Sequence, residues 1–296
     1  MNEAGKSWQI REALLWSERR LAEAGIECPR REASLLLRAA CGVSKETYYQ
    51  FRPSHRLDEP TTRRFRCWTA KRAERVPLAY LTGECEFYGR LFDVSPDVLI
   101  PRPETEHLVE EVLQWVQTRQ TSHERLQVAD LGTGSGVIAV TLAAEQQNLR
   151  LIATDLSDAS LRVARNNARR HGVENRIQFV QGDWYEALRQ FIDPGTLDVI
   201  VSNPPYIDAD RRGSLQPELR YEPERALFAG QEGYADLFQL VDGAGRFLHD
   251  RGAIFLEIGA DQYERVSDRL RRRGFAVRGV RDFAGHWRVV IGEKSV

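Results

Sequence analysis

The sequence predicts an α/β protein with a mostly parallel, seven-stranded sheet, preceded by a small helical domain and a β-hairpin linker. From residue 126 onward, short apolar runs of strand length alternate with helical patterns, which is typical of a parallel sheet. Residues 7 to about 75 show only the apolar spacing of helices. Between these parts, aromatic and β-branched residues flank Gly89, as in a hairpin. We therefore expect three parts, over residues 1–75, 76–100 and 101–296.

Length and composition are those of a soluble globular protein of about two domains. The chain has 296 residues, of which 42% are hydrophobic and 29% are charged. A net charge of −1 gives no general basic footprint for nucleic acid. Residues 1–75 hold 16 Lys and Arg against 10 Asp and Glu, whereas the remainder holds 26 against 33. The basic part is either a solvated arginine-rich surface or a docking face for an acidic partner.

Several classes of protein are disfavoured by what the sequence lacks. The four cysteines and six histidines show no metal-ligand spacing, so we expect reduced thiols and no metal site. Residues 1–6 lead into an amphipathic pattern and not into the apolar core of a signal peptide. No apolar run approaches the ~20 residues of a transmembrane helix. We therefore expect a cytoplasmic monomer with no membrane segment.

Three helices are expected in the N-terminal domain. The apolar stripe of the first ends at Gly25, that of the second ends at Gly42, and the third covers residues 61–75. Nothing in this domain looks catalytic. After the hairpin, the prolines of residues 99–106 end a strand. The acidic residues of that stretch suit the first turn of a helix that includes Leu108.

Seven strands are expected in the C-terminal part, near residues 126–131, 150–155, 177–181, 197–202, 253–258, 275–280 and 287–291. Only Gly285 and polar residues separate the last two, which indicates an antiparallel hairpin at an edge of the sheet. The first five alternate with helices and should be parallel. Their carboxyl ends would then share one edge, where open α/β sheets bind ligands.

The stretch Asn203-Pro204-Pro205-Tyr206 directly follows the strand at 197–202. Its prolines remove two N–H donors, so the corner is rich in hydrogen-bond acceptors. The side-chain oxygen of Asn203 and the carbonyl of Pro204 could accept both hydrogens of one planar NH₂ group. Tyr206 adds a flat face that could cover the group carrying this NH₂. We predict that Asn203, Pro204 and Tyr206 are catalytic and that the whole stretch binds the substrate.

A glycine-rich turn joins the first strand to a helix that starts near Val137. It reads Gly132-Thr133-Gly134-Ser135-Gly136, and its glycines would let a ligand approach the backbone closely. The NAD fingerprint GxGxxG is excluded, because it would require glycine at position 137 and this chain has Val137. No Lys-Ser or Lys-Thr pair follows, so a phosphate-binding P-loop is excluded as well.

Acidic residues follow the neighbouring strands. Asp155 ends the second strand, 23 residues after Gly132, and could accept hydrogen bonds from both hydroxyls of a ribose. Asp183 and Trp184 follow the third strand and offer a carboxylate and a broad ring for an adenine. Asp130 could attract a positively charged amino group. Each acid could instead be an ordinary strand-end cap, but together they suit S-adenosyl-L-methionine, an adenosine with an amino-acid tail and no phosphates.

The glycine loop, the acidic second strand and Asn-Pro-Pro-Tyr resemble class I methyltransferases that modify planar NH₂ groups. Further stretches narrow the resemblance to the peptide chain release factor glutamine methyltransferases over essentially the whole chain: residues 77–83, 87–89, 99–106, 221–228 and 256–259. The resemblance implies a Rossmann-like fold and S-adenosyl-L-methionine as cofactor. It also implies methylation of the glutamine amide nitrogen (N5) in the Gly-Gly-Gln motif of release factors. The implied cofactor contacts are Gly132–Gly136, Asp155, Trp184 and Asn203, and the implied glutamine-binding motif is Asn203–Tyr206.

Two other functions remain open on the sequence alone. A nucleic-acid adenine methyltransferase would present its substrate NH₂ similarly, but residues 76–296 are acidic overall and show no basic groove. A cofactor-binding scaffold without turnover would be expected to lack the Asn or the Pro-Pro, and this chain has both.

For the basic N-terminal domain we expect a recognition role, in which it binds the body of the release factor. Structural or pocket-shaping roles are expected for Arg102, Glu104, Glu106, His107, Glu257 and His286.

Overall fold

The computed structural model describes residues 8–119 and 125–294. The chain forms two compact units. The first comprises the residues up to Glu84 together with Pro217–Tyr221, and the second comprises Cys85–Gln216 and the residues from Glu222 onward. The short segment Pro217–Tyr221 therefore belongs to the N-terminal unit, although more than a hundred residues separate it from the rest of that unit. Nothing in the sequence pattern indicated this insertion.

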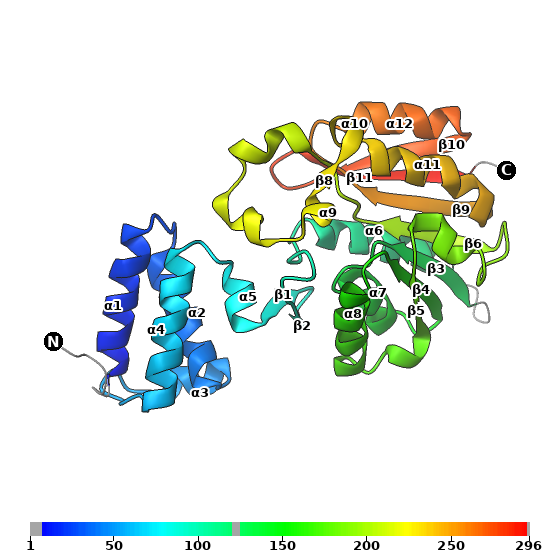
Figure 1. Cartoon of the computed structure of the whole chain (residues 1–296). Helices are drawn as coiled ribbons and strands as arrows, with labels where there is room; N and C mark the ends of the chain where they lie inside the picture. Colours follow the sequence, from blue (N-terminus) through cyan, green and yellow to red (C-terminus); the bar gives the residue numbers. More distant parts are fainter. Residues whose placement is uncertain (1–7, 120–124, 295–296) are drawn as a thin grey trace. The chain divides into compact units, whose positions relative to one another are not determined.

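The first unit is a bundle of helices (Figure 1): α1 (Ile10–Glu23), α2 (Pro29–Cys41), α3 (Lys45–Gln50), α4 (Glu59–Ala73) and α5 (Leu78–Thr82). Leu21, Leu36, Leu37 and Phe65 are fully buried in its core. The three predicted helices are α1, α2 and α4. The other two, with 6 and 5 residues, are too short to show an apolar period in the sequence.

A buried arginine links the inserted segment to the helices of this unit. Arg72 of α4 donates from Nε to Oε2 of Glu32 at 2.5 Å and from Nη1 to Oε1 of Glu218 at 3.0 Å. Glu218 lies in the 3₁₀ helix η4 (Pro217–Tyr221). The hydroxyl of Tyr221 donates to the carbonyl of Glu74 at 2.9 Å. These contacts give the inserted segment a fixed place in the helical unit.

The second unit is built on a seven-stranded sheet with the order β10-β11-β9-β6-β3-β4-β5. Its strands are β3 (Leu126–Leu131), β4 (Leu149–Asp155), β5 (Ile177–Gln181), β6 (Leu197–Ser202), β9 (Leu248–Glu257), β10 (Phe275–Arg281) and β11 (Trp287–Lys294). Five strands are parallel, and β11 pairs antiparallel with both β9 and β10. The predicted parallel strands and the edge hairpin are confirmed.

Helices cover both faces of this sheet (Figure 1). One face packs against α6 (Thr105–Arg119), α7 (Val137–Glu145) and α8 (Asp158–Arg170), and the other against α11 (Ala235–Phe247) and α12 (Tyr263–Arg272). On β6, Val199 and Val201 enter the first core while Ile200 enters the second. Burial on both faces is the reason that these strands are continuous apolar runs without alternation.

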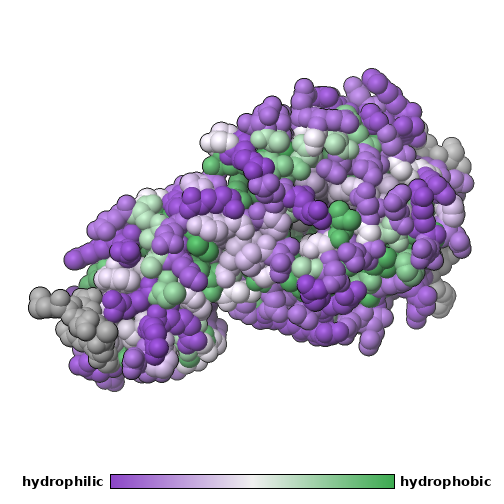
Figure 2. Space-filling model, viewed as in Figure 1, coloured by the Kyte–Doolittle hydropathy of each residue, from purple (hydrophilic) through white to green (hydrophobic). Residues whose placement is uncertain are grey.

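Smaller elements complete the second unit. The predicted hairpin is formed by β1 (Glu84–Phe87) and β2 (Arg90–Asp93), with Gly89 at φ 68° in the turn. The two-residue strands β7 (Ile207–Asp208) and β8 (Phe228–Ala229) pair in parallel. The remaining short helices are η1 (Glu174–Arg176), η2 (Trp184–Leu188), η3 (Ala209–Ser214), α9 (Glu224–Leu227) and α10 (Gly230–Gly233). Hydrophilic side chains dominate the face of the molecule in Figure 2.

Candidate active site

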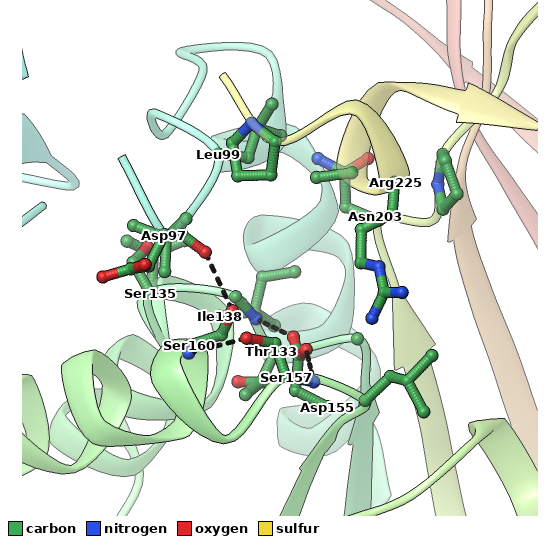
Figure 3. A pocket seen from close by; sticks show the side chains of 18 of the residues that line it. Asp97, Leu99, Thr133, Ser135, Ile138, Asp155, Ser157, Ser160, Asn203 and Arg225 are labelled. Atoms are coloured by element: carbon green, nitrogen blue, oxygen red, sulfur yellow. Dashed lines mark hydrogen bonds between the residues drawn. The ribbon is translucent and has the colours of Figure 1, made fainter. Parts of the chain in front are cut away.

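A cavity of about 570 Å³ opens at the carboxyl ends of β3, β4 and β6. A cavity of this size is typical of small-molecule sites, which span roughly 300–1,000 Å³. In Figure 3, Asn203 and Arg225 lie on one side of the cavity, and Asp155 and Ser157 lie on the other. The predicted site residues in its lining are Gly132, Thr133, Gly134, Ser135, Asp155, Asp183, Trp184, Asn203 and Pro205.

The glycine loop forms the floor of this cavity by means of backbone angles that other residues rarely adopt. Gly132, Gly134 and Gly136 have φ values of 75°, 56° and 83°. A Cβ at position 132 would lie 3.1 Å from the ring of Trp184. A Cβ at position 136 would lie 3.0 Å from the Cβ of Ala164 on α8. The first glycine thus lets the indole approach the loop, and the last lets α8 pack against the start of α7.

Asp155 ends β4 and lies against the glycine loop. Its Oδ2 accepts from the backbone N–H of Gly134 and its Oδ1 from that of Ser157, both at 2.9 Å. Burial raises the pKa of Asp155, while these two amides and the nearby Arg225 guanidinium favour its charged form. A carboxylate with a fixed orientation therefore lines the cavity, and it suits hydroxyl donors and repels phosphates.

Trp184 lines the cavity with its indole ring half-buried. Its Nε1 donates to Oδ1 of Asp236 at 3.1 Å, so the plane of the ring is fixed by α11. The residue has φ 36°, which is rare for a non-glycine residue. Asp183 lines the cavity beside it and is exposed. The ring and the carboxylate lie where the sequence predicted an adenine-binding surface.

Asp130 has a different place from the predicted one. Its side chain is fully buried and does not line the cavity. Its Oδ2 accepts from the hydroxyl of Thr133 at 2.6 Å and from the N–H of Ala139 at 3.2 Å. Burial raises its pKa to about 7. This geometry does not fit direct contact between Asp130 and an amino group in the cavity. The carboxylate instead links Thr133 of the glycine loop to the backbone of Ala139 in α7.

The Asn-Pro-Pro-Tyr stretch leaves β6 at the wall of the cavity. Asn203 and Pro205 line it, whereas Pro204 is buried and Tyr206 is half-buried behind the wall. The carbonyl of Tyr206 accepts from Nε2 of Gln262 at 3.1 Å. Burial, and then the neighbouring carboxylate of Glu257, raises the pKa of the Tyr206 phenol well above its usual value. The phenol therefore stays neutral across the physiological range.

Behind Asn203 lies a hydrogen-bond network that the sequence did not reveal. Asn203 donates from Nδ2 to Oγ1 of Thr105 at 3.2 Å, and Thr105 donates to Oε2 of Glu257 at 2.7 Å. The hydroxyl of Tyr206 donates to Oε1 of the same carboxylate at 3.3 Å. Glu257 ends β9 and is 1% exposed. Sequence separations of 98 and 152 residues hide such contacts from any local pattern.

A second buried carboxylate, that of Glu222, holds the stretch at residues 99–106. Glu222 is buried. Its carboxylate accepts hydrogen bonds from Nη2 of Arg102 at 2.5 Å and from the backbone N–H of Ile100 at 3.1 Å. Arg102 lines the cavity. Glu106 lies outside the lining and accepts from the N–H of Tyr88 at 2.8 Å. The 99–106 stretch thus shapes the wall, as the sequence suggested, and it also supplies Thr105, which lines the cavity.

Metal-ligand clusters and membrane-length apolar helices are not found among the residues that the structure describes. Within residues 8–119 and 125–294, no three His, Cys, Asp or Glu side chains come together to hold a metal ion. None of the helices in those ranges has both the length and the apolar character that crossing a bilayer needs.

Comparison with known proteins places these features in a family context. A family model described as "Methyltransferase small domain" matches residues 111–228, and one described as "PrmC N-terminal domain" matches residues 12–83. A "Release factor glutamine methyltransferase" of Moorella thermoacetica is 41% identical over 267 residues, which is 90% of either chain. A protein of the same name from Bordetella pertussis is 41% identical and covers 92% of this chain and 97% of its own.

Among solved structures, a methyltransferase from Pyrococcus furiosus shares the fold. It superposes with a TM-score of 0.51 at 20% identity and covers 71% of this chain and 91% of its own. The class I methyltransferase fold expected from the sequence is confirmed.

Proposed function

The chain belongs to the release factor glutamine methyltransferase family, and from this membership we propose how its residues act. The enzyme transfers a methyl group from S-adenosyl-L-methionine to the side-chain amide nitrogen (N5) of a glutamine in a peptide chain release factor. The observation that carries the proposal is the place of Asn203, which lines a cavity also lined by Asp155 and Trp184 and donates its NH₂ group to Thr105, leaving Oδ1 as an acceptor. S-adenosyl-L-methionine supplies the electrophilic methyl group when it is bound.

The residues around the cavity suit that cofactor. Gly132 and Gly134 offer backbone without side chains, Asp155 offers an oriented carboxylate for ribose hydroxyls, and Trp184 offers a fixed ring for the adenine. Acidic residues in the lining, with Asp183 as a second carboxylate, favour a ligand that carries no phosphates.

The corner at Asn203 addresses the chemical difficulty of the substrate. An amide nitrogen is a poor nucleophile because its lone pair is delocalised into the carbonyl. Oδ1 of Asn203 and the carbonyl of Pro204 would accept its two hydrogens and hold the π face of the nitrogen toward the cavity. These acceptors also stabilise the positive charge that develops on the nitrogen. Fixed orientation of the reacting groups can supply roughly 7–11 kcal/mol of the barrier.

The proposed target is the glutamine of the Gly-Gly-Gln motif. Two glycines before the glutamine make a narrow loop, which suits entry of one side chain into a walled cavity. We propose that the basic N-terminal domain, residues 1–75, recognises the body of the release factor. We also propose a cytoplasmic monomer that acts on protein and not on nucleic acid. The acidic balance of residues 76–296 supports the last point.

Mass spectrometry tests the function directly. A purified bacterial release factor, incubated with the enzyme and isotopically labelled S-adenosyl-L-methionine, should gain one labelled methyl group on the glutamine of Gly-Gly-Gln. Asn203→Ala should lower kcat about 5- to 150-fold, the cost of an unpaired amide donor, while cofactor affinity changes less. A labelled DNA or RNA with no label on the release factor would reject the proposal.

The same assay tests the role of the N-terminal domain. Charge reversal at the exposed Arg30 and Arg31 of α2 should raise KM for the release factor. Reversal of the exposed Arg271 on α12 is the matched control and should leave KM unchanged. Equal KM values for the wild type, the Arg30 and Arg31 variant and the Arg271 variant would exclude docking through this face of α2.

A further inference from the structure

The carboxylate of Glu257 contacts the Asn203–Tyr206 stretch directly at Tyr206 and indirectly, through Thr105, at Asn203. One oxygen accepts the hydroxyl of Thr105 at 2.7 Å, and the other accepts the hydroxyl of Tyr206 at 3.3 Å. Thr105 is 2% exposed and Glu257 is 1% exposed, so water does not compete for these bonds. The first contact leads on to Asn203, because Oγ1 of Thr105 lies 3.2 Å from Nδ2 of Asn203.

The chemistry of these groups fixes the direction of each hydrogen bond. An ionised carboxylate can only accept, and a threonine hydroxyl has a single hydrogen to donate. Once Thr105 donates this hydrogen to Glu257, its oxygen can only accept a bond from Asn203. The NH₂ group of Asn203 must therefore face Thr105, and its Oδ1 must face away. Within the described residues Asn203 forms no other side-chain hydrogen bond, so Oδ1 is left for a ligand.

We propose that Glu257 and Thr105 are positioning residues for methyl transfer, because together they orient the carboxamide of Asn203 with its acceptor oxygen toward the substrate amide. This inference rests on the proposed function. A carboxamide turned by 180° would place its own NH₂ opposite the NH₂ of the substrate glutamine. Two donors would then face each other, and the nitrogen would be neither held nor stabilised as charge develops.

The same carboxylate also sets the far end of the stretch. Tyr206 binds Oε1 through its hydroxyl, and its carbonyl accepts from Gln262, which donates to the carbonyl of Gly233 as well. A Cβ on Gly233 would lie 2.3 Å from the carbonyl oxygen of Tyr206, so the backbone here is tightly packed. Glu257 thus holds both Asn203, through Thr105, and Tyr206 in one arrangement.

A purely structural role for this network makes a different prediction from a positioning role. Loss of a structural hydrogen bond lowers the stability of the fold and leaves kcat of the folded enzyme unchanged. Loss of a positioning bond lowers kcat, while the cavity 
and its affinity for S-adenosyl-L-methionine are retained. The two roles are separated by kinetics on folded protein.

Thr105→Val is the direct test, because valine keeps the shape of threonine and removes only the hydroxyl. We expect kcat on the release factor to fall about 5- to 150-fold, as for an unpaired amide donor. The dissociation constant of S-adenosyl-L-methionine, measured by calorimetry, should change less than about threefold. Thr105→Ser restores the hydroxyl and should recover most of the turnover.

Thr141→Val is the matched control. Thr141 is a fully buried threonine of α7, and its hydroxyl has no hydrogen-bond partner within the described residues. The same substitution there should leave kcat at the wild-type value. Glu257→Gln tests the network from its other end. A glutamine carboxamide can face Thr105 with either its oxygen or its NH₂. Where the NH₂ faces Thr105, that hydroxyl must donate toward Asn203, so kcat should fall, but less than in Thr105→Val.

The outcomes separate the two levels of the argument. Wild-type kcat in Thr105→Val would overturn the positioning role while leaving the proposed function intact. Equal losses in Thr105→Ser and Thr105→Val would overturn it too, because the hydroxyl would then not be the cause. If the wild-type enzyme itself does not label the glutamine, the proposed function fails first.

Discussion

At the scale of single residues, the active-site corner depends on buried groups that hold their protons differently from free side chains. Burial raises the pKa of Glu257 to about 7, and the carboxylate of Glu104 adds to this rise. The hydroxyls of Thr105 and Tyr206 and the guanidinium of Arg288 act in the opposite direction. Only the ionised form of Glu257 can accept both hydroxyls, so the orientation of Asn203 depends on pH.

The ionisation of Glu257 determines how kcat and stability should each change with pH. Below the pKa of Glu257, near 7, the protonated acid can donate to Thr105 and reverse the bond to Asn203. We therefore expect kcat to rise as pH increases through about 7 and to level off above it. Stability should change in the other direction. The unfolded chain releases this proton first, so the unfolding free energy falls as pH rises toward 7.

A pH profile of kcat under saturating substrates checks this expectation. Glu257→Gln has no proton to lose at this position, and its profile should be flat over the same range. An inflection near pH 7 that persists unchanged in Glu257→Gln would assign the titration to another group.

Much of the site could be predicted at this scale, and its limits are physical. Asn203, Asp155 and the glycines follow strand ends, where local pattern identifies them. Asp130 lies one residue before the end of β3, and its side chain is fully buried. The sequence could not show this, because a strand buried on both faces has no polar alternation to tell which way a side chain points. The partnership of Thr105 with Glu257 exists only after folding brings α6 to β9.

At the scale of elements, the glycine loop couples a turn to the packing of two helices. Gly136 precedes the first residue of α7 as its N-cap, has φ 83° and lies against Ala164 of α8. Gly134 has φ 56°, but a Cβ there would meet nothing within 4 Å. An alanine at either position would carry the cost of a left-handed backbone. Only at position 136 would its Cβ also clash with a neighbouring helix, α8.

Alanine substitutions at these two positions should separate the two costs. Gly134→Ala should lower the unfolding free energy by about 1–2 kcal/mol, the cost of left-handed backbone in an L-residue. Gly136→Ala should cost more, because α8 must also shift. Denaturant titrations of both variants measure the difference. Equal losses would show that α8 accommodates the extra methyl group without strain.

Long elements were predicted from sequence, and so were the four-residue strands β1 and β2, which flank a glycine turn, whereas the shortest helices and strands were missed. The apolar runs of β3, β5 and β6 identify those strands with correct boundaries. β7 and β8, with two residues each, pair only because the chain between them returns to the same place. No periodicity can be read from two residues.

At the scale of the whole molecule, Arg72 determines how the helical unit is completed. Its side chain is 8% exposed and lies between Glu32 and Glu218, which are each 19% exposed. Removing one partner from such a buried cluster leaves charges without compensation. On the same helix, Arg63 pairs with Glu59 at 3.6 Å with 74% and 78% of the side chains exposed.

Methionine substitutions at these two arginines of α4 should therefore differ strongly. Arg72→Met should lower the unfolding free energy by about 3–5 kcal/mol, because Glu32 loses its buried cation and Glu218 keeps only Arg75. Arg63→Met removes an exposed pair and should change it by less than about 1 kcal/mol. Thermal and denaturant unfolding of both variants provide the comparison, and similar values would show that the cluster is effectively solvated.

The insertion of Pro217–Tyr221 into the helical unit has a consequence for synthesis on the ribosome. The nascent chain emerges from its N-terminus, so α4 leaves the exit tunnel long before Glu218, its partner 146 residues later. Until then Arg72 can pair with Glu32 but lacks its second carboxylate partner, Glu218. The helical unit is thus completed later than the position of α4 in the chain suggests, and its co-translational folding should reach its end point only after residue 221 has appeared.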